Sequence, residues 1–82
     1  MNNELKLLFN RLCEAINLPN GFEIKDGKGK KYLKLDHNSI YGGYRINIVH
    51  ESTGESFYDI SERLSSREMT IYIRGLLKGL EN

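Results

Sequence analysis

The sequence holds 82 residues, of which 39% are hydrophobic and 28% charged, and its formal net charge is +1. These values predict one globular domain, residues 1–82, and exclude a disordered tail, a fibrous repeat or a second domain. One cysteine, Cys13, and two histidines are too few for a disulfide scaffold or a structural zinc site, so we expect no metal and no cofactor. Neither a long apolar run nor a basic leader is present, which predicts a cytoplasmic protein without a membrane partner.

Residues 3–17 have the apolar pattern of an amphipathic helix. Asn2 or Asn3 can cap its start, and the turn-forming residues 18–21 end it. The apolar residues recur at helical spacing and form one stripe: Leu5, Leu8, Phe9, Leu12 and Ile16.

The middle of the chain predicts β-structure. Apolar and polar residues alternate in 22–25 and in 32–35, and the Asp-Gly signal within 26–29 indicates a hairpin turn between them. A third strand is predicted at 44–50, and the short apolar run 56–58 predicts a fourth.

The last predicted helix begins with a capping box, because Glu68 follows Ser65 by three residues. Gly75 and Gly79 lie on its flank, which predicts close approach of the first helix or of a partner. Its apolar stripe runs to about Leu80 and contains Met69, Tyr72, Ile73, Leu76, Leu77 and Leu80.

Together these elements predict an α+β fold in the order α-β-β-β-(β)-α. Hairpin-connected strands are antiparallel, and each helix has one apolar stripe to bury against the sheet. We therefore expect a two-layer sandwich with both helices on one face of the sheet and the other face open to water.

Residues suited to catalysis do not converge in the sequence. Asp36, His37 and Ser39 are the residue types of a catalytic triad, but neighbours on a strand end point in different directions. Cys13 borders the first apolar stripe and is expected to be a buried, inert thiol. We therefore predict no catalytic residues and no enzymatic activity.

Basic and aromatic residues gather on the predicted open sheet face and in the turn beside it. Alternation along the strands places every second residue on this face, including Tyr58 on the fourth strand. Exposed sheets of this composition bind single-stranded nucleic acid in several families. The alternative function is therefore nucleic-acid binding through Lys28, Lys30, Lys31, Tyr32, Lys34, Arg45 and Asn47.

A structural role explains the same charges. Glu23, Lys25 and Asp36 share the predicted open face, and mixed charges on a solvated sheet form cross-strand pairs. Lysines in a turn also keep an exposed strand edge soluble.

The loop 36–43 is long for a hairpin and contains Ile40 and Tyr41. Such side chains in a loop indicate either a partner site or a lid folded back over the small core. Leu7 and Ile71 lie opposite the apolar stripes of their helices and are expected to face solvent. If they are neighbours, they form a patch through which a homodimer can assemble.

Two resemblances accompany these patterns. The order α-β-β-β-α in a short chain is similar to the double-stranded-RNA-binding domain, although residues 65–68 have one arginine beside one acid where that family has a lysine cluster. The pairing of Asn-Ser-Ile-Tyr-Gly-Gly-Tyr (38–44) with residues 66–77 resembles small uncharacterised proteins of bacterial prophages and mobile elements, a family that implies no known activity.

The expected function is that of a small non-enzymatic binding or adaptor protein. It would act through the loop 36–43 or through the helical face, on an unknown protein partner or on a second copy of itself. Leu7, Ile40, Tyr41 and Ile71 are the candidate contacts. The sequence does not indicate the biological process.

Overall fold

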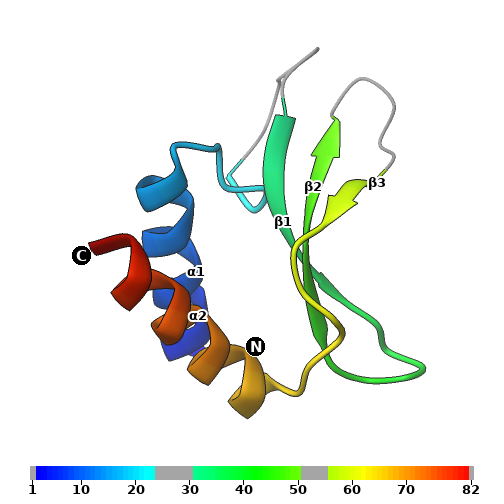
Figure 1. Ribbon diagram of the computed structural model, residues 1–82. Helices are drawn as coiled ribbons and strands as arrows, with labels where there is room; N and C mark the ends of the chain where they lie inside the picture. The colour runs from blue at the N-terminus through cyan, green and yellow to red at the C-terminus, as the bar shows by residue number, and fades with distance from the viewer. Residues whose placement is uncertain (1, 24–30, 51–55, 82) are drawn as a thin grey trace.

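The computed structural model describes residues 2–23, 31–50 and 56–81, and it has the predicted α+β architecture. Three antiparallel strands form a sheet in the order β1-β2-β3, and both helices lie on one side of it (Figure 1). In chain order the elements are α1 (Asn3–Ile16), β1 (Lys31–His37), β2 (Tyr44–His50), β3 (Ser56–Asp59) and α2 (Ser66–Glu81).

Helix α1 begins and ends through side-chain and backbone caps. The Asn2 Oδ1 atom accepts a hydrogen bond from the Leu5 amide at 2.7 Å, which confirms the predicted N-cap. Asn17 adopts the left-handed conformation at φ 59°, and the amide of Leu18 then donates to the carbonyl of Cys13 at 3.0 Å. The chain is thereby turned from the helix toward the sheet.

The strand predicted at 22–25 is wrong within the described residues. Phe22 and Glu23 lie in a turn, and Asn20 instead forms an isolated parallel bridge to Leu33 of β1. The Asn20 side chain accepts from the Phe22 amide at 2.9 Å and its carbonyl accepts from the Glu23 amide at 2.9 Å. Turn formation by asparagine therefore overrides the short alternating pattern. Residues 24–30, with the predicted hairpin turn, lie outside the described residues.

The register of the sheet sets which side chains face the helices. Leu33 of β1 is opposite Ile48 of β2, and Leu35 is opposite Ile46. On the other side of β2, Ile48 is opposite Tyr58, so the predicted fourth strand is confirmed as β3. An irregularity between Ile48 and Val49 shortens this second pairing.

The helical stripes and the strands meet in one core. Helix α2 contributes Met69, Ile73 and Leu77, whereas Leu80 is exposed, so the buried stripe ends one turn earlier than predicted. The buried cluster is composed of Leu5, Leu8, Phe9, Leu12, Cys13, Leu33, Leu35, Tyr44, Ile46, Met69, Ile73 and Leu77.

The two helices run parallel, side by side. At their starts the Asn2 side-chain amide donates to the Ser66 hydroxyl at 3.0 Å. Further along, Glu4 pairs with Arg74, and at the far end Arg11 pairs with Glu81 at 2.9 Å. The N-terminal ends of the two helices therefore lie together, and so do their C-terminal ends. Contacts between the helices thus join residues far apart in the sequence.

The predicted capping box of α2 is confirmed. The Ser65 amide donates to the Glu68 carboxylate at 3.0 Å, and the Glu68 amide donates to the Ser65 hydroxyl at 3.1 Å. The hydrogen bond from the Ser65 amide, together with that residue's side chain, lowers the pKa of Glu68. These hydrogen bonds fix the first turn of α2, which follows the connection from β3.

Gly75 should be replaceable by alanine with a gain in stability. A Cβ atom built on Gly75 or Gly79 meets no atom within 4 Å, so the predicted close approach of the first helix is wrong, whereas approach of a partner stays a prediction. Alanine in a helix interior is about 0.8–1 kcal/mol more favourable than glycine. We expect Gly75→Ala to raise the midpoint of thermal unfolding by roughly 4–8 °C. The same change at Gly79, in the last turn, should give a smaller rise; a fall at Gly75 would contradict this account.

Candidate functional site

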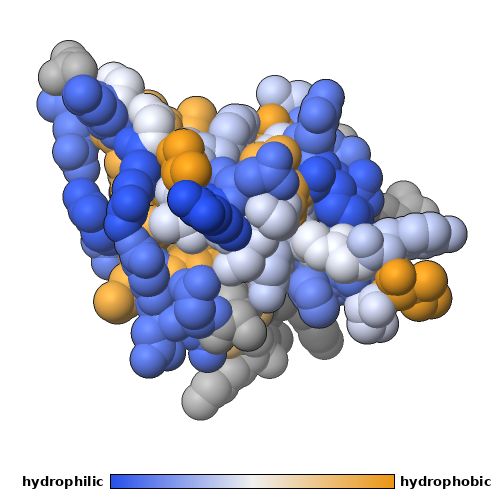
Figure 2. Space-filling model, turned by 90° about the horizontal axis from the view of Figure 1, so that it is seen from below, coloured by the Kyte–Doolittle hydropathy of each residue, from blue (hydrophilic) through white to orange (hydrophobic). Residues whose placement is uncertain are grey.

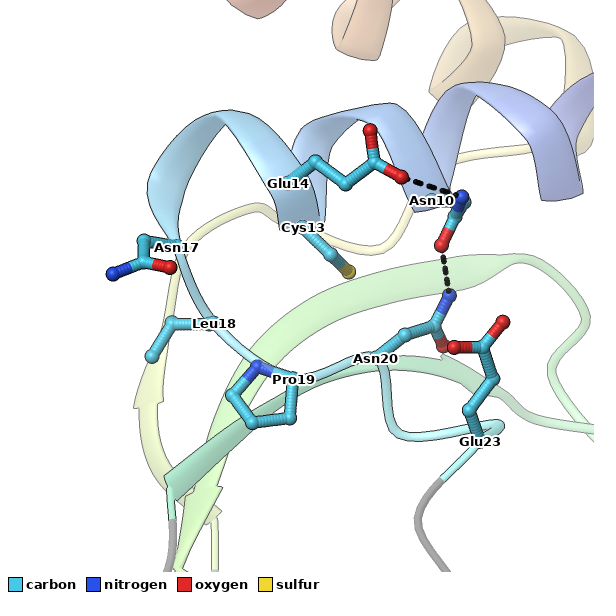
Figure 3. A pocket seen from close by; sticks show the side chains of 8 residues that line it. All are labelled: Asn10, Cys13, Glu14, Asn17, Leu18, Pro19, Asn20 and Glu23. Atoms are coloured by element: carbon cyan, nitrogen blue, oxygen red, sulfur yellow. Dashed lines mark hydrogen bonds between the residues drawn. The ribbon is translucent and has the colours of Figure 1, made fainter.

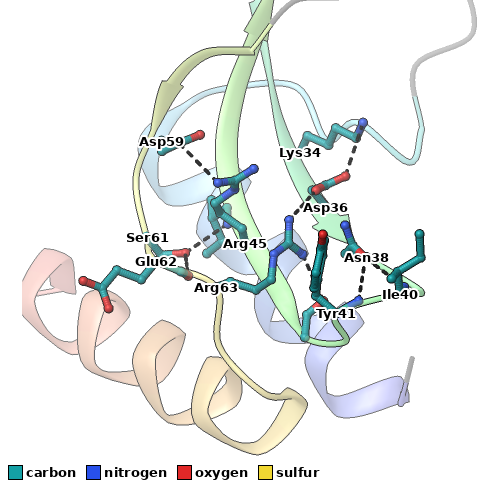
Figure 4. Close-up of polar contacts among 12 residues, drawn as sticks. Lys34, Asp36, Asn38, Ile40, Tyr41, Arg45, Asp59, Ser61, Glu62 and Arg63 are labelled. Carbon is teal, nitrogen blue, oxygen red and sulfur yellow. Dashed lines mark hydrogen bonds and ion pairs between the residues drawn. The ribbon is translucent and has the colours of Figure 1, made fainter.

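The turn between β1 and β2 projects two large side chains into solvent. Ile40 is 85% exposed and Tyr41 is 83% exposed, so neither forms the lid over the core that was one of the two expectations for this loop. The Asn38 Oδ1 atom accepts hydrogen bonds from both of their amides, each at 2.8 Å (Figure 4). Asparagine thereby fixes the backbone that presents the two side chains.

Arg63, from the connection between β3 and α2, braces the base of this loop. Its guanidinium donates to the Asp36 carboxylate at 3.0 Å and to the Gly43 carbonyl at 3.3 Å (Figure 4). Asp36 is the penultimate residue of β1, and Gly43 directly precedes β2. One planar side chain therefore joins both stems of the loop.

Two consecutive glycines complete the loop. Gly42 and Gly43 have φ angles of 73° and 79°, a region that favours glycine. Gly43 also lies against the chain before α2, because a Cβ there would be 2.9 Å from the Leu64 carbonyl. This approach allows Tyr44 and Leu64 to exchange backbone hydrogen bonds at 2.6 and 2.7 Å. The loop is consequently fixed by the Arg63 side chain and by the backbone hydrogen bonds between Tyr44 and Leu64.

The sheet face away from the helices is less open than predicted. On the central strand β2, Asn47 is 5% exposed and Val49 is 3% exposed. Tyr58 is not on this face, because it is opposite Ile48, whose side chain packs against the core. The prediction of an open face that includes Tyr58 is therefore corrected.

The basic side chains of that face are held by acids. Lys34 lies 3.7 Å from Asp36, and Arg45 lies 3.6 Å from Asp59. Tyr32 is half-buried against Gly21, while Lys31 is exposed at the start of β1. Lys28 and Lys30 lie outside the described residues. Within the described residues, Lys34 and Arg45 of the predicted nucleic-acid interface therefore form ion pairs with acidic side chains. Such pairs are expected if these charges stabilise the sheet.

Leu7 and Ile71 are both exposed, as predicted, but they line different hollows. The hollow beside Ile71 measures about 480 Å³, and the hollow beside Leu7 about 300 Å³. The two hollows share no lining residue: the one beside Leu7 is bordered by Phe22 and Glu23, and the one beside Ile71 by Ser66 and Arg67. From below, apolar side chains appear as separate spots among hydrophilic ones (Figure 2).

Another hollow, of about 430 Å³, opens where α1 meets the segment leading to β1 (Figure 3). Cys13 lies at its floor and is 2% exposed. Burial, with a contribution from the charges of Glu23 and Glu14, raises the pKa of Cys13 to about 12. The thiol therefore stays protonated at neutral pH and is a poor nucleophile, as the sequence predicts.

The triad residue types are used in other contacts. The His37 ring lies against the Tyr44 ring, with centroids 4.7 Å apart, and Asp36 is engaged by Arg63 and Lys34. Within residues 2–23, 31–50 and 56–81, no three His, Cys, Asp or Glu side chains are grouped so that they can hold a metal ion.

Acid should weaken the Asp36–Arg63 contact. The hydrogen bond from Arg63 lowers the pKa of Asp36 below 3.8; partial burial opposes this effect, and the charge of Lys34 adds to it. A carboxyl group whose pKa is lower in the folded state stabilises the fold at any pH above its unfolded-state pKa. This contribution is lost as the pH falls through the folded-state pKa. We expect the urea midpoint to fall less between pH 7 and pH ~3 in Asp36→Asn than in the natural protein. Equal falls would show that the contact contributes nothing.

The roles of Arg63 and of the side-chain amides beside Cys13 were not predicted from the sequence. Arg63 lies in an irregular segment, and only the fold brings it to Asp36, 27 positions away. In the hollow, Asn20 donates to Asn10 at 3.3 Å and Asn10 donates to Glu14 at 3.2 Å. Only the Asn10–Glu14 contact has a local pattern, because the two residues are four positions apart on one helix.

No match to this chain was found among known protein families, curated proteins or solved structures. The resemblances to the double-stranded-RNA-binding domain and to prophage proteins therefore stay predictions. Neither described helix has the length and apolar character needed to cross a membrane.

Proposed function

We propose that this protein is a non-enzymatic binding module that contacts a partner protein through the Ile40–Tyr41 tip of the β1–β2 loop. The observation that carries the proposal is the exposure of both side chains, above 80%, on a braced backbone. Exposed apolar anchors on a rigid loop lose little conformational entropy on binding. Tyrosine is also among the residues enriched at the energetic centre of protein interfaces.

The loop supports this proposal better than the helical face does. Ile40 and Tyr41 are consecutive residues of one loop, whereas Leu7 and Ile71 lie beside separate hollows. Two exposed anchors on one short loop can both contact a single partner surface, which excludes water from each of them.

Site-specific photocrosslinking in the native host tests the proposal. A photoreactive residue at Ser39, next to the tip, should form adducts with another protein chain, and a second at exposed Lys78 of α2 should not form the same adducts. In the Ser39-labelled chain, Ile40→Ser with Tyr41→Ser should abolish the adducts, whereas Leu7→Ser with Ile71→Ser should leave them. Adducts lost only with the helical pair would move the binding site to the helical face, and no adduct from Ser39 would refute the proposal.

The nucleic-acid alternative has a separate test. Binding through lysine and arginine contacts to phosphate weakens steeply as salt rises. Because Lys34 and Arg45 are held by acids, we expect the purified protein to show no affinity for single-stranded or duplex oligonucleotides at low salt. Measured affinity that falls with salt would favour the alternative instead.

A further inference from the structure

A hollow of about 350 Å³ lies at the base of the Ile40–Tyr41 tip. Its lining includes Gly42 and Gly43, which have no side chains, and the space beside Gly42 is open, since a Cβ there meets no atom within 4 Å. The other lining residues are Tyr41, Arg63, Leu64 and Ser65.

The lining of this hollow suits an aromatic ring. The Arg63 guanidinium is fixed by its hydrogen bonds to Asp36 and Gly43, and planar guanidinium groups stack on aromatic faces. Leu64 also lines the hollow, although its side chain packs against the core, and the bare backbone of Gly42 lets a flat group approach closely.

Tyr41 borders this hollow and supplies an aromatic ring at its edge. Tyr41 is 83% exposed and belongs to the same loop. In a two-fold contact between identical chains, each surface patch meets its own copy. Because the Tyr41 ring lies next to the hollow, the ring of one copy can face the hollow of the other in such a contact.

The charges around the loop also favour contact between copies. A charged residue near a two-fold axis repels its own symmetry mate, and residues 38–44 contain no charged side chain. Arg63 is neutralised by Asp36 at 3.0 Å, and the whole chain has a net charge of only +1. Long-range repulsion between two copies is correspondingly small.

We infer that the partner of this loop is a second copy of the chain, with the Tyr41 ring of each copy lying in the hollow of the other. The inference rests on the proposed function, because it names the partner of the same tip. Two anchors make a contact below the size of a standard stable interface, so the dimer is weak and reversible, with affinity in the micromolar to millimolar range.

Sedimentation of the purified full chain over a concentration range up to ~1 mM tests this inference. The mean mass should rise from 9.5 kDa toward that of two chains. Tyr41→Ser should weaken association at least about tenfold, whereas Tyr41→Phe, which keeps the ring, should stay within about threefold of the natural protein. Leu7→Ser removes an equally exposed apolar side chain from α1 and should change nothing.

Isotope-filtered NMR on an equal mixture of labelled and unlabelled chain locates the contact. Intermolecular cross-peaks are expected between the Tyr41 ring and Leu64. A mass of one chain at every concentration, or association that responds to Leu7→Ser and not to Tyr41→Ser, overturns the inference. If the chain stays monomeric while Ser39 still gives loop-dependent adducts with a different protein, self-association is wrong and the proposed function stands.

Discussion

Phe9→Ala should destabilise the folded protein by about 3–5 kcal/mol. Phe9 is 0% exposed and is among the largest fully buried side chains of the core. Domains of this size have total stabilities of about 5–15 kcal/mol and bury a smaller share of their surface than larger proteins do. Urea titration followed by circular dichroism should therefore show an unfolding midpoint far below that of the natural protein.

Phe22→Ala is the matched control. The Phe22 ring packs edge-on against Phe9, with centroids 5.7 Å apart, but Phe22 is 53% exposed. Its removal should cost about 0.5–1.5 kcal/mol, the value of one aromatic pair. Equal losses for the two variants would mean that Phe9 is not the centre of the core.

Gly43→Ala should destabilise the protein by about 2–4 kcal/mol. The φ angle of 79° is unfavourable for alanine, and its Cβ would lie 2.9 Å from the Leu64 carbonyl. That oxygen also accepts the hydrogen bond from the Tyr44 amide, so the loop and the chain before α2 must separate. Thermal unfolding measures the loss, and amide exchange at Tyr44 should become faster.

Gly42→Ala separates backbone strain from the steric clash. Its φ angle of 73° is similar, but a Cβ at Gly42 meets no atom within 4 Å. We expect a loss of about 1–2 kcal/mol, the cost of the left-handed conformation alone. If Gly42→Ala were the more damaging change, the contact between Gly43 and Leu64 would not support the loop.

Features set by neighbouring residues were predictable from the sequence. The Asn2 cap, the Ser65–Glu68 capping box and the helical stripes each depend on residues a few positions apart, and all are present except for the exposed Leu80 at the end of the second stripe. The α+β class follows from those stripes together with the alternating strands. Exposure of Ile40 and Tyr41 was one of two expectations, because alternation and turn signals do not say whether a loop folds back.

Features set by tertiary contacts were not predictable in the same way. The alternating residues at 22–25 indicated a strand, but hydrogen bonds to Asn20 hold Phe22 and Glu23 in a turn. Val49 alternates onto the solvent side of β2 and is nevertheless buried. Arg63 supports the loop from a segment without a periodic pattern. These outcomes depend on what packs nearby in space, which a single sequence does not state.

The parallel pairing of α1 with α2 has a consequence for how the chain acquires its structure. Contacts such as Asn2 with Ser66 and Arg11 with Glu81 span 64 and 70 positions. Contacts between residues far apart in the sequence slow folding, because the chain loses the entropy of closing a long loop before the contact can stabilise it. During synthesis, the apolar face of α1 stays exposed until α2 has left the ribosome and can pack against it. We expect the nascent chain to bind chaperones during that interval, because exposed apolar surface promotes aggregation.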